Sequence, residues 1–587
     1  MKQEILYAAM LGLVVWSLGQ EKPAMGQTRA PRSGVVDMGA PSSPGAFIIG
    51  PRSTPTHPFG TDVRANQDTG TAAQNETTIA ANPTNPNNLV GGANDYRGPD
   101  SACGFYSSID GGLTWRPDGT LPVGAFGAGG DPAVAFDRNG NVYYACLRFN
   151  RSTNANDIAV AKSTNGGLTY SAPVTVVSGA NGNDFNDKEY IAVDTTAGAF
   201  SGRVYVTWTH FSATDAQIRR YFSADGGATW AAPLTISDTQ NNQGSIPAVG
   251  PNGEVYVVWE DFNVDRLHID KSTDGGISFG TDVTVSSIIP IPDPLPGFSF
   301  RTNSFPTLAV DTTNGACRGN VYVAWADFRN GNADIFFSRS TNGGAAWSAA
   351  TRIDHAPGSA HSFFPAMTVD PQGTVHIVYY DNRVTSNRLD VFASRSADCG
   401  NTFTPSDTFS PGSDDRVTDT SFDPALDGFS GQFIGDYIGV TATGQFVHPL
   451  FMSTALRGNA DAVTDRTTAG TLPGGVVCDM QLNKTNFVNG DSVIAQVLRI
   501  ANPGTVEVPV ELKIWFDIPG MAPASFANTG ANGSVKLPPG FTTNAGPLTL
   551  FTVSTAFPRG TYGFNCRLLN PVTGGLLTED LNPFQIQ

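Results

Sequence analysis

Acidic and tyrosine residues stand where several short apolar runs begin. They are Glu76, Asp131, the run Asp187–Tyr190 and the pair Asp436–Tyr437. The runs, such as "EYIAVD" (189–194) and "DYIGVT" (436–441), read as β-strands. Cleavage of a glycosidic bond needs a proton donor and a nucleophile or base, usually two carboxyl groups. These residues are therefore candidates for chemistry, and a solvated loop or a strand cap is the competing interpretation for each carboxylate.

A second polar motif, Asp-x-Arg, follows a predicted strand three times. The copies are Asp95/Arg97, Asp327/Arg329 and Asp381/Arg383. Recurrence favours a structural role, in which the carboxylate and the guanidinium cap a loop as an ion pair. Three guanidinium groups at one rim would alternatively bind a carboxylate ligand through bidentate hydrogen bonds.

The most frequent motif is a glycine-rich phrase that occurs six times. The copies are "SIDGGLTW" (108–115), "STNGGLTY" (163–170), "SADGGATW" (223–230), "STDGGISF" (272–279), "STNGGAAW" (340–347) and "SADCGNTF" (396–403). Its third residue is Asp in four copies, but Asn165 and Asn342 replace it in two. An amide cannot act as a general acid, whereas it can accept hydrogen bonds from backbone N–H groups in a tight turn. The phrase is therefore interpreted as a turn-forming motif.

Short strands surround each phrase. After residue 305, "PTLAVD", "NVYVAWADF", "ADIFFSRS" and "ATRID" predict four strands, and successive phrases begin 49 to 68 residues apart. Four antiparallel strands repeated at this period indicate a β-propeller. Seven candidate first strands, near residues 76, 131, 189, 246, 306, 365 and 436, favour seven blades, with six as the alternative. We expect "GTDVRANQ" (60–67) to supply the strand that the last blade lacks.

The sequence divides into five parts and predicts an all-β protein. Residues 1–26 predict a signal peptide, because the apolar run 5–18 is too short to span a bilayer and a small-x-small site follows it. Residues 27–59 form a Pro/Gly-rich linker, residues 60–466 the propeller and residues 467–475 a second linker. Residues 476–587 predict about seven strands with the spacing of an immunoglobulin-like β-sandwich.

The six phrases resemble the Asp box, S-x-D-x-G-x-T-W, also called the BNR repeat, of the sialidase (neuraminidase) superfamily. The resemblance covers roughly residues 60–466. It implies an Asp-box β-propeller in which the boxes join the third and fourth strands of a blade, on the face away from the active site. It also implies an exported carbohydrate-active protein, and favours a glycoside hydrolase of exo-sialidase type.

The resemblance suggests roles for the candidate residues. Asp131 is the expected proton donor, Tyr190 or Tyr437 the nucleophile, and Glu189 the base that assists it. The residues expected to contact the substrate are Arg97, Arg329, Arg383 and Asp436.

Two other functions remain open, since residues 60–83 lack the Arg-Ile-Pro motif with which sialidases of this fold usually begin. A polysaccharide lyase would need a Tyr or His pair, for which His210 and His361 are candidates. A non-catalytic propeller that binds glycans or proteins at the cell surface is the other alternative. A mouth filled by Phe185, Phe305 and Phe363 without paired carboxylates would favour it.

The charge of −17 argues against nucleic acid and anionic membranes as partners. The resemblance implies a glycan or polysaccharide as the substrate. No apolar run after residue 18 is long enough for a membrane span, so with the signal peptide a secreted, periplasmic or cell-surface protein is expected. We also expect a monomer.

The six cysteines contain no CxxC pair, as expected in an oxidising compartment. Their order allows Cys103–Cys146, Cys317–Cys399 and Cys478–Cys566, with buried free thiols as an alternative for the first pair. No cofactor or metal site is expected, although "NGNDFNDKE" (181–189) and "SDD" (413–415) are rich enough in oxygen ligands for structural Ca²⁺.

Overall fold

The computed structural model divides into two compact units, residues 57–470 and residues 471–587 together with 1–56. It describes residues 60–181, 184–403, 415–443 and 446–468 of the first unit. In the second unit it describes residues 477–484, 486–502, 508–518, 524–528, 535–537, 541–544, 548–555, 557–569 and 576–586. The predicted signal peptide (1–26) and linker (27–59), most of the predicted linker 467–475, and residues 413 and 414 lie outside these ranges.

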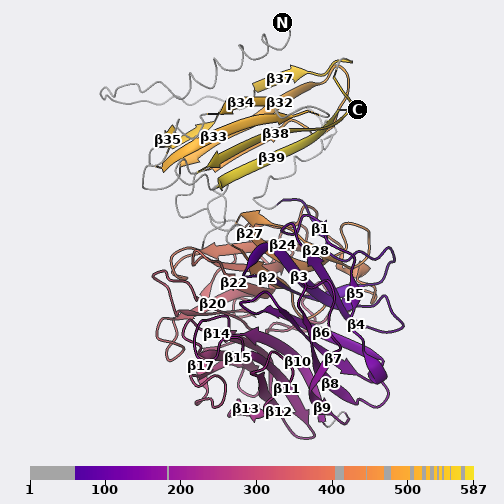
Figure 1. The fold of residues 1–587 in the computed structure, drawn as a ribbon, viewed down its shortest axis with the longest axis vertical. Coiled ribbons are helices and arrows are strands. Elements are labelled where there is room, and N and C mark those ends of the chain that lie inside the picture. The colour runs from indigo at the N-terminus through magenta and orange to yellow at the C-terminus, as the bar shows by residue number, and fades with distance from the viewer. Residues whose placement is uncertain are drawn as a thin grey trace, which may run out of the picture. The chain divides into compact units, whose positions relative to one another are not determined.

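The described residues form an all-β structure (Figure 1) with two 3-10 turns, Gly124–Phe126 and Pro424–Leu426. Within them, no helix has the length and apolar character needed to cross a bilayer.

Antiparallel sheets follow one another along the first unit. The first contains β2 (Gln74–Asn82), β3 (Asn85–Asp95), β4 (Ala102–Ser108) and β5 (Gly119–Thr120). The second contains β6 (Ala128–Phe136), β7 (Val142–Phe149), β8 (Asn156–Ser163) and β9 (Val174–Gly179). The third contains β10 (Asp184–Val193), β11 (Val204–Ser212), β12 (Ala216–Ser223) and β13 (Leu234–Thr235).

The next three sheets have the same order. The fourth contains β14 (Asn242–Val249), β15 (Val255–Asp261), β16 (Arg266–Ser272) and β17 (Val283–Ser287). The fifth contains β18 (Thr307–Val310), β19 (Val321–Asp327), β20 (Asp334–Ser340) and β21 (Thr351–Arg352). The sixth contains β22 (Ser362–Val369), β23 (Val375–Asp381), β24 (Asp390–Ser396) and β25 (Asp415–Arg416).

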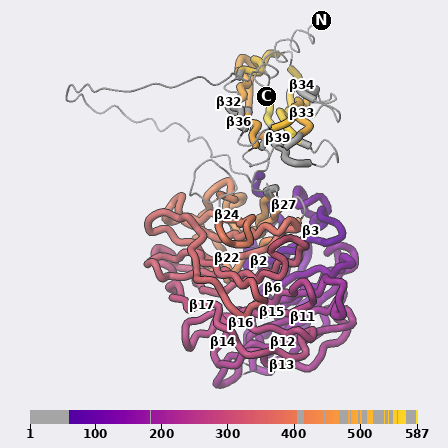
Figure 2. Tube along the Cα trace, turned by 90° about the vertical axis from the view of Figure 1, so that its left-hand side faces the viewer, coloured from indigo at the N-terminus to yellow at the C-terminus, as the bar shows by residue number. Residues whose placement is uncertain are grey.

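The seventh sheet joins the two ends of the unit. It contains β26 (Gly439–Ala442), β27 (Phe446–Ser453), β28 (Asp461–Thr464), β29 (Thr467–Thr468) and, from the N-terminal side, β1 (Val63–Arg64). Val63 pairs with Thr464 and Arg64 with Val463, so "GTDVRANQ" supplies the missing strand as expected. The orange β27 lies beside the indigo strands β2 and β3 in both views (Figures 1 and 2).

The first strands of the sheets are in contact in a closed cycle. The order is β2, β6, β10, β14, β18, β22, β26 and back to β2. Sheets that pack in a cycle through their first strands form a β-propeller. The second strands are its most buried parts: every residue of β15, β19 and β23 is buried.

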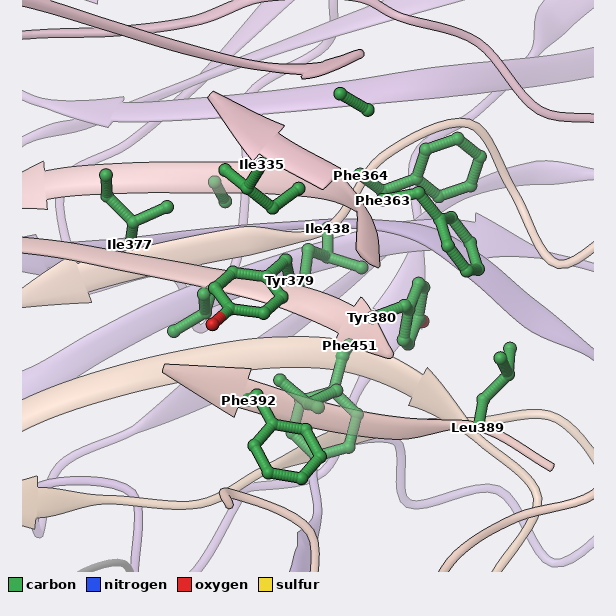
Figure 3. Packing of buried hydrophobic residues seen from close by; sticks show 14 of the residues in the cluster. Ile335, Phe363, Phe364, Ile377, Tyr379, Tyr380, Leu389, Phe392, Ile438 and Phe451 are labelled. Carbon is green, nitrogen blue, oxygen red and sulfur yellow. The ribbon is translucent and has the colours of Figure 1, made fainter. Parts of the chain in front are cut away.

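The core continues from sheet to sheet, because apolar side chains on both faces of each sheet pack against the next one. Figure 3 shows Phe363 and Tyr380 of the sixth sheet in the same cluster as Ile335 of the fifth and Phe451 of the seventh. Phe363 therefore belongs to the core.

The glycine-rich phrases are turns between the third and fourth strands of six sheets. In the first, Ser108 ends β4; its Oγ accepts from Gly112 N at 2.9 Å and donates to Asp110 Oδ1 at 2.8 Å. Asp110 also accepts from Thr114 N at 2.9 Å. In the second, Asn165 Oδ1 accepts from Ser163 Oγ and Thr169 N in the same way. The third residue is thus a hydrogen-bond acceptor, as the Asp/Asn exchange predicts.

The second unit contains two sheets around one core. One contains β30 (Val477–Leu482), β32 (Ser492–Asn502), β36 (Phe541–Asn544) and β37 (Leu548–Thr552). The other contains β31 (Asn486–Phe487), β33 (Val508–Asp517), β34 (Ala524–Asn528), β35 (Val535–Leu537), β38 (Gly560–Leu569) and β39 (Leu576–Ile586). Val493 of the first sheet and Phe516 and Phe564 of the second are buried in the same cluster.

Three disulfides pair all six cysteines: Cys103–Cys146, Cys317–Cys399 and Cys478–Cys566. The first joins two neighbouring sheets of the propeller and the third joins the two sheets of the second unit. These are the pairs that the order of the cysteines allows, and the first pair is not a pair of free thiols.

Candidate functional site

The site is built on an irregularity that recurs near the start of the first strands. The register shifts between Asn75 and Thr78, between Gly130 and Ala133, and between Asp187 and Tyr190. The first of the two residues inside each shift has a left-handed backbone: Glu76 (φ 53°), Asp131 (φ 55°) and Lys188 (φ 54°). Such a conformation is unfavourable for residues with a side chain, and a β-bulge redirects the side chain that it carries.

Three bulges from consecutive sheets therefore bring two carboxyl groups and one ammonium together. The Nζ of Lys188 lies 3.1 Å from Glu76 Oε1 and 3.2 Å from Asp131 Oδ1. A third carboxylate comes from the loop that precedes β26, with Asp436 Oδ2 2.6 Å from the same Nζ. All four side chains are buried. A buried ammonium is stable here because three carboxyl groups surround it.

Arg301 extends this cluster toward the solvent. Its Nε donates to Asp436 Oδ1 at 2.7 Å and its Nη2 donates to Asp436 Oδ2. Nη2 also lies 3.6 Å from Glu76 Oε1, and the guanidinium lies over the ring of Phe433 at 4.5 Å. The Arg301 side chain is half exposed, so one edge of the guanidinium faces outward.

Asn94 and the Lys188 backbone hold the two carboxyl groups in place. Asn94 Nδ2 donates to Glu76 Oε2 at 2.8 Å, and its Oδ1 accepts from the backbone N of Asp131 at 2.8 Å. The backbone N of Lys188 donates to Asp131 Oδ2 at 3.3 Å. One amide side chain on β3 thus connects the first bulge to the second.

The cluster forms the floor of a cavity of about 490 Å³. Glu76, Asp131, Asp187, Lys188, Arg301 and Asp436 all line it. Its walls include six aromatic side chains, Tyr96, Phe149, Phe185, Phe262, Phe305 and Phe433, beside polar ones such as Arg151 and Gln243. A concave site with aromatic walls and a few converging charged groups is typical of a small-molecule or glycan site.

Burial and mutual repulsion separate the pKa values of the carboxyl groups. Burial, opposed by Lys188 and reinforced by Asp131, raises the pKa of Glu76 well above its usual range. Burial and the neighbouring Asp131 carboxylate raise the pKa of Asp187 to about 7. Gln243 Nε2 also donates to Asp187 Oδ2 at 3.2 Å.

Asp131 differs from its neighbours. Burial would raise its pKa, but the Lys188 ammonium and hydrogen bonds from Glu76 and Asp187 outweigh burial and lower the pKa below the usual range. Asp131 is therefore a carboxylate with a protonated carboxyl group on either side. Paired groups whose pKa values are pushed apart are suited to acid and base roles.

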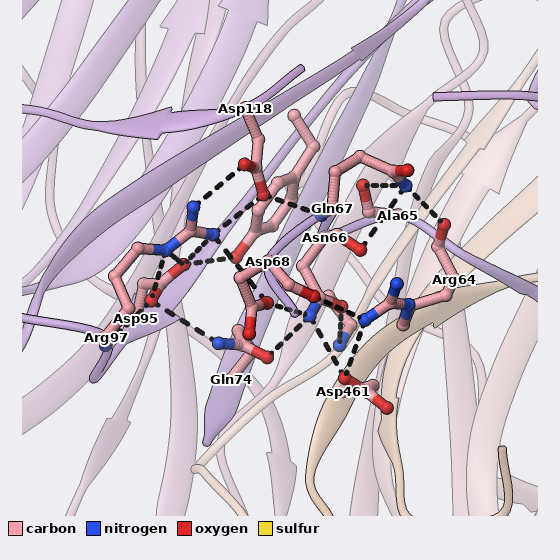
Figure 4. A network of polar contacts seen from close by, with 12 residues as sticks. Arg64, Ala65, Asn66, Gln67, Asp68, Gln74, Asp95, Arg97, Asp118 and Asp461 are labelled. Carbon is pink, nitrogen blue, oxygen red and sulfur yellow. Dashed lines mark hydrogen bonds and ion pairs between the residues drawn. The ribbon is translucent and has the colours of Figure 1, made fainter. Parts of the chain in front are cut away.

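The three arginines of the Asp-x-Arg motif are bound by their own aspartates. The distances are 2.6 Å for Arg97 Nη2–Asp95 Oδ2, 2.5 Å for Arg329 Nη2–Asp327 Oδ2 and 2.7 Å for Arg383 Nη2–Asp381 Oδ2. Among the described residues, the cavity lining includes none of the three. Arg97 also donates to both oxygens of Asp118, within the polar network of Figure 4 that surrounds Arg64–Asp68.

The predicted tyrosines and Glu189 are buried or half-buried and, in the described part of the chain, do not line the cavity. The rings of Tyr190 and Tyr437 pack at 5.4 Å, and the Tyr437 hydroxyl donates to the carbonyl of Pro132 at 3.2 Å. Burial raises the pKa of both tyrosines above their usual range. Both oxygens of Glu189 are buried, and within the described part of the chain no group hydrogen-bonds them. The structure therefore does not bring Glu189 into hydrogen-bond contact with either hydroxyl.

The remaining candidate residues, two histidines and two phenylalanines, lie in different parts of the first unit. His361 Nδ1 accepts from Ala333 N at 3.1 Å, and His210 lies beside Asn186. Phe185 and Phe305 line the cavity. The cavity thus combines two of the predicted phenylalanines with paired carboxyl groups. No cluster of three or more His, Cys, Asp or Glu side chains in the described ranges is arranged to hold a metal ion.

The charged residues that complete the cluster were only partly recognisable from the sequence. Glu76, Asp187 and Lys188 were visible as single residues where strands begin, but without a role. Arg301 was missed; its one signal was that the interval between the fourth and fifth phrases, which contains it, is the longest of the five.

No family model matches the chain, and no curated protein matches it. Solved structures similar to it include a Hadza microbial sialidase, at 13% identity over 65% of this chain and 73% of that chain, with a TM-score of 0.39. An α-L-arabinanase of Penicillium chrysogenum complexed with arabinobiose is 11% identical over 70% of this chain and 98% of that chain (TM-score 0.39). An ulvan lyase is 12% identical over 58% and 82% (TM-score 0.36). Those activities belong to the neighbours, so the chemistry of this chain has to follow from its own cavity.

Proposed function

We propose that the sheets of the first unit are seven blades of an Asp-box propeller of sialidase-like type and that its cavity hydrolyses a glycosidic bond. The observation that carries this proposal is that one cavity with aromatic side chains in its walls is lined by both Asp131, whose pKa is lowered, and Asp187, whose pKa is raised to about 7. A carboxylate and a carboxylic acid on either side of a glycosidic bond are the two groups that this hydrolysis requires.

In the proposed reaction Asp187 is the acid and Asp131 the nucleophile. Asp187 gives its proton to the glycosidic oxygen while a carboxylate oxygen of Asp131 forms a bond to the anomeric carbon and the carbon–oxygen bond to the leaving group breaks. Water then attacks the anomeric carbon, gives a proton to Asp187 and releases Asp131.

Lys188 and Glu76 support Asp131 in this proposal. The ammonium keeps Asp131 ionised at 3.2 Å, and the protonated Glu76 hydrogen-bonds it from the other side. Arg301, which is half exposed at the cavity rim, contacts the substrate together with its partner Asp436. The roles suggested by the sialidase resemblance thus change: Asp131 moves from proton donor to nucleophile, and Tyr190, Tyr437 and Glu189 become packing residues behind it.

The test is turnover of a panel of fluorogenic glycosides and linear polysaccharides by the full chain. Asp131→Asn and Asp187→Asn are expected to lower kcat by about 100-fold or more, since acid–base and nucleophilic groups contribute at least that much. Asp225→Asn is the matched control, because it lies in the glycine-rich turn of the sheet that carries Asp187, where two other copies of the phrase have Asn. Full activity in Asp131→Asn, or an unsaturated uronate product instead of a hydrolysed one, would contradict the proposal.

A second candidate function is glycan binding without turnover. The phenylalanines of the cavity wall favour it, because aromatic faces bind the apolar face of a sugar ring. A folded protein that binds a glycan in the panel but turns none over would identify this function.

We also propose that the second unit is an immunoglobulin-like sandwich and that the protein works, as a monomer, outside the cytoplasm. The two sheets that share one core and the three disulfides support these assignments.

A further inference from the structure

A second cavity, of about 360 Å³, lies beside the first one over the third and fourth sheets. Three segments line it: the β11–β12 turn with Ser212, Thr214 and Asp215, the residues Gln240 and Asn241 before β14, and Asn263 in the β15–β16 turn. Hydroxyl and amide groups dominate, and Asp215 contributes a carboxylate. We refer to this cavity as the amide groove.

The walls of the amide groove are fixed to one another by hydrogen bonds. Asn241 N donates to Asp215 Oδ1 at 3.4 Å, and Asn241 Nδ2 donates to Asn263 Oδ1 at 3.3 Å. Asn263 Nδ2 donates to the carbonyl of Gln240 at 2.9 Å. Asn241 has a left-handed backbone (φ 65°), which is uncommon for a residue with a side chain. The groove is therefore built by three separate turns that hold each other in place.

The amide groove and the first cavity share a ridge. Gln243 lines the first cavity, three residues after Gln240, and Phe262 lines it immediately before Asn263. Phe262 N donates to the carbonyl of Asn241 at 3.1 Å, which joins the two sides of the ridge. The Phe262 side chain is 40% exposed and packs edge-on against Phe305 at 6.4 Å. A large apolar ring thus stands between the two cavities.

We propose that the amide groove is a subsite for further residues of a linear, uncharged glycan that extends from the first cavity across Phe262. The inference rests on the proposed glycan site and adds the substrate class, a chain instead of a single terminal sugar. Amide and hydroxyl groups donate and accept hydrogen bonds as sugar hydroxyls require, and the exposed ring offers a face for stacking. The carboxylate of Asp215 disfavours an anionic chain at this position.

Binding is measured in the Asp131→Asn background, so that the result does not depend on turnover. The probes are soluble arabinan, xylan and galactan, with polygalacturonate as the anionic comparison, in affinity electrophoresis. At least one neutral glycan is expected to retard the protein. Phe262→Ala should weaken that binding about tenfold, which corresponds to the stacking of one ring.

Two further variants complete the test, one in the groove and one outside both cavities. Thr214→Leu puts a bulkier side chain, without a hydroxyl group or an aromatic ring, on an exposed position of the groove, and should weaken binding of the same glycan without removing any aromatic residue. Val264→Ala is the matched control for Phe262→Ala. Val264 is a 49% exposed apolar residue of the β15–β16 turn that follows Phe262, and among the described residues it lines neither cavity.

Equal retardation of the parent and both groove variants, retardation by polygalacturonate alone, or no retardation by any glycan would each overturn the inference. Hydrolysis of a small aryl glycoside by the wild-type chain would meanwhile uphold the proposed function on its own, so the two failures are distinguishable.

Discussion

Lys188 of the third sheet and Asp436, in the loop that precedes β26, form an ion pair of 2.6 Å. Since Lys188 also contacts Glu76 and Asp131, its ammonium connects four segments that are far apart in the sequence. The Lys188 ammonium therefore lowers the pKa of Asp131 and also holds together the segments that surround it.

Replacing Lys188 by Met is expected to destabilise the propeller strongly, because three buried carboxyl groups would lose their common cation. Breaking a buried ion pair by removing one partner costs about 4 kcal/mol. Denaturant unfolding of the full chain measures the change. Lys162→Met is the control, because this lysine is more exposed, and its free energy of unfolding should fall by less than about 1 kcal/mol. An equal fall in both variants would contradict the structural role of Lys188.

The rate of hydrolysis is expected to fall as the pH rises through about 7. The proposed acid Asp187 has a pKa of about 7 and must be protonated, whereas the pKa of Asp131 is lowered and leaves it ionised at every pH above 4. The raised pKa also affects stability. The folded pKa of Asp187 lies above the usual value of 3.8, so protonated Asp187 contributes to the free energy of unfolding below pH 3.8, and this contribution is lost as the pH rises through 7.

The pH dependence of kcat for an activated aryl glycoside, which needs little help from the acid, checks this assignment. In Asp187→Asn the residual rate should lose the fall near pH 7. A fall with the same midpoint in the variant would place the titrating group elsewhere.

The closure of the propeller is expected to depend on Asn66. This side chain is fully buried; its Nδ2 donates to Gln74 Oε1 at 2.8 Å and to Asp461 Oδ1 at 3.0 Å, and its Oδ1 accepts from Ala462 N at 3.0 Å. Asn66→Ala should lower the free energy of unfolding by about 3 kcal/mol, because it leaves several buried partners unsatisfied. Gln67→Ala, at the exposed neighbouring position, is the control and should change it by less than about 1 kcal/mol.

The glycine-rich turns are expected to tolerate an amide but not a methyl group. Asp110→Asn keeps an acceptor for Thr114 N, whereas Asp110→Ala removes it. We expect a loss of about 1 kcal/mol for Asp110→Ala, and less for Asp110→Asn. Thermal unfolding of the two variants measures the difference, and equal losses would contradict the acceptor role.

The architecture was largely predictable because its determinants are local. The hydroxyl of Ser108 and the carboxylate of Asp110 form hydrogen bonds within one turn, so each copy of the phrase predicts a turn without reference to the rest of the chain. The four-strand pattern and the closing strand near residue 63 also follow from short segments. The order of the cysteines allowed the disulfide pairs, and the structure establishes them.

The site was less predictable because its geometry comes from backbone conformations that the sequence does not reveal. Nothing in the residue types of Glu76, Asp131 and Lys188 indicates a left-handed bulge, yet that bulge turns the three side chains toward one another. Arg301 lies in an irregular segment between sheets, where no repeat predicts its position. For Arg97 the sequence left two interpretations open, and its contacts with Asp95 and Asp118 correspond to the ion-pair interpretation.

The pairing of β1 with β28 has a consequence for how the chain reaches its native state. The strand at residues 63–64 finds its partner only after residue 464 has been synthesised, so the cycle of sheets cannot be completed sheet by sheet during translation. Joining such distant segments carries a large loop-closure entropy and slows folding. The propeller should consequently unfold as one cooperative body, unlike an open repeat array whose terminal units fray independently.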